Sequence, residues 1–378
     1  HFRETNANRD LVGGPMYYIK NGLKKHWHWL AYLFSAFGVL TVFGTGNATQ
    51  VNTITTAIDS ALINYNVIAA DNTSTVNLVM GIILAILVAM ILLGGIKRIG
   101  QVTEKLVPFM ALFYIILAVG VVIINWKNVP GVFSAIIRGA FNPASVTGGV
   151  VGSFFMSMKK GVSRGIFSNE AGLGTGSIAH ACADTRKPVK QGFFGIFEVF
   201  TDTIVICTLT GFVVVMGRVW LTEDSATWFE LGKLDRFLAS CGALTGNGVI
   251  YHFVTMLVSV CFGLFAFTCL LGFLSFTEMC ANRISTRPAF INMIRVLCLI
   301  VISFGVITNI AGMDLSALWD LSDFANILMV YCNLPLQYIG FRYVLRAWEH
   351  FEKNDGTAFT SKIAGIDVPV WDERAKIK

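Results

Sequence analysis

The chain has 378 residues, of which 54% are hydrophobic and only 14% are charged, and its mean hydropathy is +0.65. Soluble domains carry about 25% charged residues, so this composition excludes an ordinary soluble protein and indicates a membrane protein. The isoelectric point near 8.9 does not indicate nucleic acid as a partner, because no basic patch with interleaved aromatic residues accompanies it.

Eight segments are long enough to cross a bilayer, whose hydrocarbon core is about 30 Å thick and takes about 20 helical residues. They are residues 29–58, 76–96, 106–126, 148–183, 191–217, 248–279, 290–310 and 317–341. The sequence therefore predicts an all-α membrane protein, with the lipid bilayer as its surroundings and with eight spans in one bundle.

Lys and Arg gather before the first span and then on alternate connections, which the positive-inside rule assigns to the cytoplasm. The chain is thus predicted to have a cytoplasmic N-terminal connection at 1–29, a transmembrane bundle at 30–341 and a cytoplasmic tail at 342–378. We expect a multi-pass protein of the cell membrane.

The eight cysteines are scattered, mostly within apolar runs, with no Cys-x-x-Cys pair and no His at the spacing of metal ligands. We interpret them as packing residues.

The fourth segment is interrupted by charge and by glycine. Lys159, Lys160, Arg164 and Glu170 lie within it, and five glycines between 161 and 176 weaken helix continuity by about 1 kcal/mol each. A discontinuous membrane helix exposes N–H groups at one half-helix end and C=O groups at the other, where they bind anions and cations. The alternative is a continuous glycine-rich helix packed closely on a neighbour, with snorkelling lysines.

Buried charges are tolerated mainly in pairs. Arg164 and Glu170 are six residues apart, so each is expected to pair elsewhere, and we interpret both as members of gate or scaffold ion pairs. Glu198 and Asp202 are four apart on the fifth span and share a helical face. One of these two could instead relay a proton. The candidate partners of Arg164 and Glu170 are Glu198, Asp202, Asp320 and Asp323.

Several motifs together resemble the alanine or glycine:cation symporter family, the sodium:alanine symporters. They are Gly13-Gly-Pro-Met-Tyr-Tyr-Ile19, Phe43-Gly-Thr-Gly-Asn-Ala-Thr-Gln50, Gly94-Gly-Ile-Lys-Arg-Ile99, the run from Arg164 to His180, Pro188-Val-Lys-Gln-Gly192 and the run from Glu198 to Thr210. The resemblance implies a LeuT-type fold of two inverted five-helix repeats. It also implies import of alanine or glycine with sodium as the co-transported ion, by alternating access and without a cofactor.

The resemblance implies further helices before the segment that begins at Gly13, including the first core helix, whose unwound centre helps to hold substrate and sodium. The spans of this chain then correspond to core helices three to ten. We expect the chain to be part of a longer protein rather than a product that has lost half of its site.

Asn47 and Gln50 lie three residues apart on the first predicted span, so one helical face can carry both amides. By resemblance Gln50 contacts the substrate; the alternative is an interhelical hydrogen bond that satisfies a buried amide. Asn47 is predicted to bind substrate on the same face.

By resemblance the fourth span borders the substrate, so Ser153, Phe154 and Phe155 are candidate contacts, although lipid-facing Phe is common. Phe273 stands where the family usually has Trp, and its smaller ring is expected to widen the pocket.

Thr268 and Cys269 match the two neighbouring hydroxyl residues that complete a sodium site in LeuT-type carriers. The family has Ser-Thr there, whereas this chain has Thr-Cys. Sodium is a hard cation that prefers oxygen ligands, so the thiol puts the affinity, and even the identity of the coupling ion, in question. With other departures, the chain resembles a divergent member.

Rival functions are disfavoured to different degrees. A channel would need charge rings or repeated carbonyls, and nothing in the sequence repeats like a selectivity filter. An enzyme is not expected, because the histidines are dispersed and no nucleophile and base are clustered. A proton-coupled carrier of the same fold and a non-transporting amino acid sensor stay open.

Overall fold

The computed structural model describes residues 1–378 except 6–10, 45, 70–71, 94, 142–149, 171, 186, 221–230, 247, 312, 314–315, 354–355 and 377–378. A short antiparallel hairpin opens the chain, β1 (Glu4–Thr5) pairing with β2 (Leu11–Val12). The helices before the interrupted fourth segment are α1 (Pro15–Gly22), η1 (Lys25–Trp27), α2 (Trp29–Leu40), η2 (Thr41–Phe43), α3 (Ala48–Asn64), α4 (Thr73–Leu93), α5 (Gly95–Ile124), η4 (Trp126–Asn128) and α6 (Val129–Phe141).

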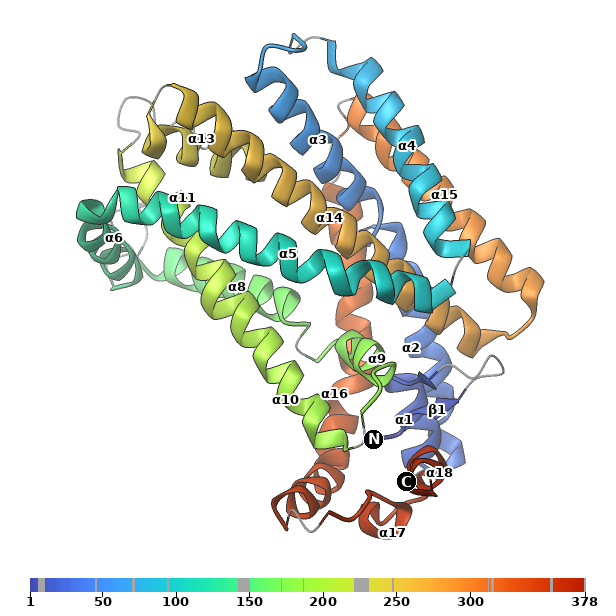
Figure 1. Cartoon of the computed structure of the whole chain (residues 1–378). Coiled ribbons are helices and arrows are strands. Elements are labelled where there is room, and N and C mark those ends of the chain that lie inside the picture. The colour runs from blue at the N-terminus through green and yellow to red at the C-terminus, as the bar shows by residue number, and fades with distance from the viewer. Residues whose placement is uncertain are drawn as a thin grey trace.

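The second half continues with α8 (Val150–Ser168), α9 (Thr175–Ala181), α10 (Pro188–Val199), the π-helical η5 (Phe200–Cys207), α11 (Thr208–Trp220), α13 (Lys233–Thr245), α14 (Val249–Ile284), α15 (Pro288–Ile310), α16 (Ser316–Lys353), α17 (Ser361–Ala364) and α18 (Pro369–Lys376). Figure 1 shows these helices in one bundle, with α17 and α18 at one end.

Five helical stretches of the described chain are long and apolar enough to cross a membrane. They are Thr73–Leu92, Arg98–Ile124, Pro188–Arg218, Val249–Ile284 and Pro288–Ile310, which match the second, third, fifth, sixth and seventh predicted spans. Their outer faces are apolar: Ile196 and Phe197 are each 68% exposed. Such a surface is stable in lipid and costly in water, so the chain is a multi-pass membrane protein.

The first predicted span is divided into separate helices, and its crossing of the membrane stays a prediction. α2 ends at Leu40, and after the single turn of η2 the chain starts a new helix at Ala48. A Cβ on Gly44 would lie 2.0 Å from Oγ of Ser322, and one on Gly46 would lie 3.0 Å from the ring of Phe273. The close approach of α16 and α14 to these glycines is a tertiary contact, which a hydropathy pattern does not contain.

The fourth predicted span is interrupted, as its sequence indicated. α8 ends at Ser168 and α9 begins at Thr175. Between them the backbone takes positive φ at Glu170 (50°), Gly172 (83°) and Gly174 (88°). Glycine adopts this conformation without strain, whereas Glu170 must be held in it by its surroundings.

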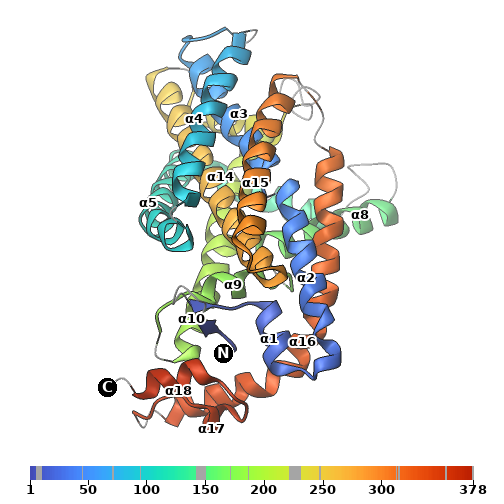
Figure 2. The same ribbon diagram turned by 90° about the vertical axis from the view of Figure 1, so that its right-hand side faces the viewer.

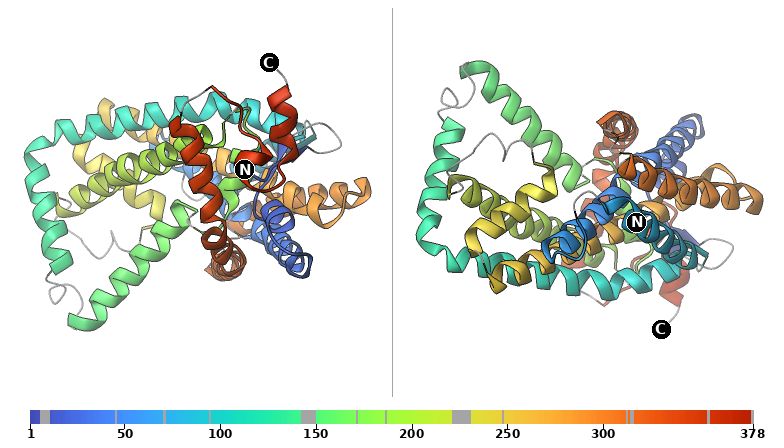
Figure 3. Two further views of the ribbon diagram at one scale, coloured as in Figure 1. Left: turned by 90° about the horizontal axis from the view of Figure 1, so that it is seen from below. Right: turned by 90° about the horizontal axis from the view of Figure 1, so that it is seen from above.

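α14 is the central helix of the bundle and contributes to three buried clusters. One lies with α3, α4 and α15, one with α5, α11 and α13, and one with α1, α2 and α16. Figure 2, turned by 90°, shows α14 and α15 between the other helices, and both views of Figure 3 show α6 and α8 extending to one side.

The last predicted span continues beyond its expected end at 341, since α16 runs on to Lys353. A terminal cluster of Ala347, Phe359, Ala364, Val368 and Trp371 then packs α17 and α18 against the end of α16.

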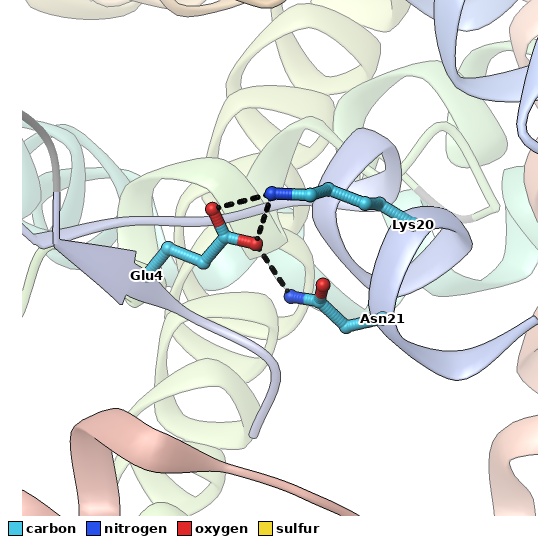
Figure 4. Close-up of polar contacts among 3 residues, drawn as sticks. All are labelled: Glu4, Lys20 and Asn21. Atoms are coloured by element: carbon cyan, nitrogen blue, oxygen red, sulfur yellow. Dashed lines mark hydrogen bonds and ion pairs between the residues drawn. The ribbon is translucent and has the colours of Figure 1, made fainter.

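The N-terminal residues join the terminal cluster. Nε1 of Trp371 donates to the carbonyl of His1 at 2.8 Å, and the guanidinium of Arg3 lies 4.0 Å from the Trp371 ring. The hairpin is tied to α1 because the carboxylate of Glu4 accepts hydrogen bonds from Lys20 and Asn21, each at 2.8 Å (Figure 4). The two predicted end segments, 1–29 and 342–378, therefore meet at one end of the bundle.

Candidate functional site

Glu170 forms a hydrogen bond across the interruption between α8 and α9. Its Oε2 accepts a hydrogen bond from Oγ1 of Thr175 at 2.7 Å. The contact holds the left-handed residue in place and sets a carboxylate beside the first turn of α9, where a negative charge is favoured. Glu170 thus pairs with a hydroxyl of its own segment, and the four acidic residues that the sequence suggested are candidate ionic partners for Arg164 alone.

Helix α10 and the π-helical η5 face this interruption with three polar contacts. Oε2 of Glu198 lies 3.1 Å from Nε2 of His180, Asp202 accepts a hydrogen bond from Oγ of Ser168, and Oγ1 of Thr203 donates to Oδ1 of Asn169 at 2.6 Å. π-helical turns occur often at functional sites. The structure therefore brings Glu198 and Asp202 to the two half-helices of the fourth segment, one to each.

Arg164 lies on α8 and reaches α16. Its Nη2 is 3.8 Å from Oδ2 of Asp323, and its guanidinium is 5.7 Å from the centre of the Trp319 ring. Asp323 is one of the four partners that the sequence suggested. Both side chains are partly exposed, so the pair contributes little stability by itself, about 0–1 kcal/mol.

The interruption between η2 and α3 carries a buried amide. Asn47 is fully buried at the start of α3, and its Nδ2 donates to the carbonyl of Cys298 on α15 at 2.8 Å. Its Oδ1 is buried and has no hydrogen-bond donor in the described part of the chain. Gln50 is half-buried in the first turn of α3. Phe273 packs on Gly46, the residue before Asn47.

Thr268 and Cys269 point in different directions from α14. Thr268 is buried, and its Oγ1 donates to the carbonyl of Phe265 at 3.0 Å and lies 3.8 Å from Sδ of Met110. Cys269 is exposed. Consecutive helical residues are rotated by about 100°, so the two side chains do not converge on one point in this conformation. The sodium role of the pair stays a prediction.

The remaining candidates lie on α8. Phe155 is 56% exposed on the described surface. The side chains of Ser153 and Phe154 lie outside the described part of the chain.

Two polar residues that the sequence reasoning missed hold the α8–α9 interruption against its neighbours. Nδ2 of Asn333 on α16 donates to the carbonyl of Gly172 at 2.7 Å, and its Oδ1 accepts from the hydroxyl of Tyr18. A Cβ on Gly174 would lie 2.4 Å from the ring of Pro15. The sequence did contain a sign of these contacts. Asn333 is an amide in an apolar helix, and Pro15 and Tyr18 belong to the motif from Gly13 to Ile19.

The chain has several membrane-spanning helices and two interrupted segments, each with polar groups beside it. These features are typical of membrane transport proteins built from discontinuous helices. Comparison with known proteins agrees. Residues 1–363 match the model of the sodium:alanine symporter family. The chain belongs to this family.

Individual relatives span much of the chain. It is 36% identical over 347 residues to an uncharacterized transporter of Haemophilus influenzae, covering 91% of this chain and 69% of that protein. It is 31% identical over 339 residues to the sodium/alanine symporter AgcS of Methanococcus maripaludis, covering 88% and 68%. It is 32% identical over 341 residues to the probable sodium/glutamine symporter GlnT of Bacillus subtilis, covering 90% and 65%.

Proposed function

We propose that this protein is a sodium-coupled secondary active symporter of the LeuT type, which imports a small neutral amino acid, alanine or glycine, by alternating access. The observation that carries the proposal is the interruption between Ser168 and Thr175, which sets irregular backbone inside a bundle of membrane helices. Irregular backbone at membrane depth is stable only where protein or a solvated cavity satisfies it. Membership of the sodium:alanine symporter family supports the same function.

In this proposal the substrate is recognised between the two interruptions. The unpartnered Oδ1 of Asn47 can accept a hydrogen bond from the ammonium group of an amino acid, which would remove the cost of a buried acceptor without a donor. Gln50 offers a second amide one turn along α3. Phe273 borders Gly46 and would limit the size of the side chain that fits.

The coupling between sodium and the amino acid follows if both ligands prefer the same conformation of the protein. If sodium and the amino acid both bind more tightly to the same state, each raises the affinity for the other by the same factor. Thr268 supplies an oxygen near the proposed sodium position, and Cys269 a sulfur that is a poor ligand for a hard cation.

A specific contact favours proton coupling as the second candidate. His180 and Glu198 are 3.1 Å apart and link the second half of the interrupted segment to α10. A contact between an imidazole and a carboxylate has the chemistry of a proton relay, so this pair could pass a proton during transport.

The deciding experiment measures uptake of radiolabelled alanine and glycine into proteoliposomes made with the full-length gene product. We expect accumulation under an inward sodium gradient, and the Asn47→Leu variant should raise the KM at least about tenfold, because one charge-assisted hydrogen bond is lost. Accumulation driven only by a proton gradient would select the second candidate. Correctly folded protein that transports neither amino acid would indicate another substrate or a sensor.

A further inference from the structure

A second group of polar side chains is buried where α3, α4 and α15 pack together, the three helices that lie side by side in Figure 1. Nδ2 of Asn77 donates to Oδ2 of Asp59 at 2.9 Å and is 3.3 Å from Oδ1 of Asn309. Nδ2 of Asn309 in turn donates to Oγ1 of Thr55 at 2.6 Å. We refer to Thr55, Asp59, Asn77 and Asn309 as the α3–α4–α15 cluster.

Two oxygens of this cluster are buried without a hydrogen-bond donor in the described part of the chain: Oδ1 of Asp59 and Oδ1 of Asn77. Asp59 is 9% exposed and Asn77 is 1% exposed. The two oxygens belong to the carboxyl and amide groups that bond to each other, so both lie beside the same contact. A buried acceptor without a donor costs about 1–3 kcal/mol, and more when it is charged.

The second observation concerns the charge of the Asp59 carboxylate. Among the described ion pairs, no Lys or Arg is paired with Asp59. An ionised carboxylate at this depth is unfavourable unless it is paired or coordinates a cation. The amide nitrogen of Asn77 makes both of its printed contacts within the cluster, and that of Asn309 donates to Thr55, so neither is drawn to the two free oxygens. A cation between the two free oxygens satisfies both of them at once.

The composition of the cluster limits the kind of cation. Its carboxylate, amide and hydroxyl oxygens are hard ligands, and the cluster holds neither sulfur nor imidazole. It carries a single carboxylate, so a monovalent ion makes the site neutral, whereas a divalent ion would leave a net buried charge. We propose that Asp59 and Asn77 are ligands of a monovalent hard-cation site between α3, α4 and α15, separate from Thr268 and Cys269.

The site is tested by equilibrium binding of ²²Na⁺ to the purified full chain in detergent, without amino acid and without a gradient. We expect Asp59→Asn to bind one sodium ion fewer per chain than the wild type. Asn77→Ala keeps the carboxylate but removes one ligand, and it should weaken the affinity of the same site at least about tenfold. The matched control is Asp235→Asn, because Asp235 accepts a hydrogen bond from Ser60, the residue after Asp59, and lies outside the cluster.

Sodium binding of unchanged stoichiometry and affinity in both cluster variants would overturn the proposal, as would a wild-type chain that binds no sodium. So would an infrared carboxylic acid band that persists in saturating sodium and disappears in Asp59→Asn, since it would assign a proton to Asp59. Because the measurement needs no transport, a failure of the proposed symport activity is recorded separately, by the uptake experiment.

Discussion

At the scale of single residues, glycines decide how closely the helices approach the interruptions. Gly44 meets Ser322 of α16, and Gly46 meets Phe273 of α14, at distances that leave no room for a side chain. Because these two glycines have no side chain, the neighbouring helices can approach the backbone closely. Their role is opposite to that of Asn47, whose side chain fills the neighbouring position and leaves one polar atom available.

Gly46→Ala should lower the stability of the protein by about 1–3 kcal/mol, because the added methyl group overpacks the contact with Phe273. The unfolding midpoint in detergent measures the change. Gly120→Ala in α5 is the matched control, since a Cβ there meets nothing within 4 Å. Adding Phe273→Ala to Gly46→Ala should recover part of the loss; equal midpoints for the two single alanine variants would refute the close contact.

At the scale of helices, an ion pair between the buried Glu278 and the half-buried Arg295 fixes α14 against α15. Arg295 donates to both carboxylate oxygens of Glu278, through Nη2 at 2.6 Å and through Nε at 3.1 Å. Leu274, Thr277 and Cys298 line a small cavity beside the pair. The bidentate geometry sets the rotation of the two helices, and thereby the position of the Cys298 carbonyl that holds Asn47.

Arg295→Met should destabilise the protein by about 3 kcal/mol, because it leaves the carboxylate of Glu278 buried without its partner. The double variant Glu278→Leu with Arg295→Met should recover most of this loss, since apolar side chains can replace a buried pair. Chemical unfolding in micelles is the measurement, and Arg287→Met, at the exposed start of the same helix, is the control. If the double variant were as unstable as Arg295→Met, packing rather than charge would explain the effect.

At the scale of the whole molecule, the two chain ends close one end of the bundle. Asp372 of α18 accepts hydrogen bonds from the backbone N–H and the hydroxyl of Ser361, at 2.8 Å and 2.5 Å. These bonds favour the ionised carboxyl and lower the pKa of Asp372 below its usual value. The terminal cluster thus depends on a charge that acid removes.

A lowered pKa in the folded state contributes stability above the unfolded pKa of about 3.9 and loses it as the pH falls through the folded value. Asp372→Asn should therefore loosen α17 and α18 already at neutral pH, and the wild type should match it only in acid. Limited proteolysis after Lys353 measures this, with the exposed Asp367→Asn as control. Equal cleavage of both variants at neutral pH would show that the Asp372 bonds are dispensable.

Part of this architecture was readable from the chain alone, and particular residues show why. Long apolar runs predicted the five membrane-length helices, since hydropathy over about 20 residues reports directly on the solvent around a helix. Glycines and charges around Glu170 predicted the interruption of the fourth segment, because they weaken a helix wherever they stand. The family motifs indicated the family that comparison then confirmed.

The tertiary structure decided the features that depend on residues far apart in the sequence. The break at Gly44 and Gly46 needs α14 and α16 beside it, and the hold on Gly172 needs Tyr18 and Asn333. The α3–α4–α15 cluster joins Asp59 to residues 18 and 250 positions away along the chain, that is, to Asn77 and Asn309. The local sequence pattern reports whether a segment lies in lipid or in water. A polar site forms where several distant segments pack together, so only the tertiary structure reveals it.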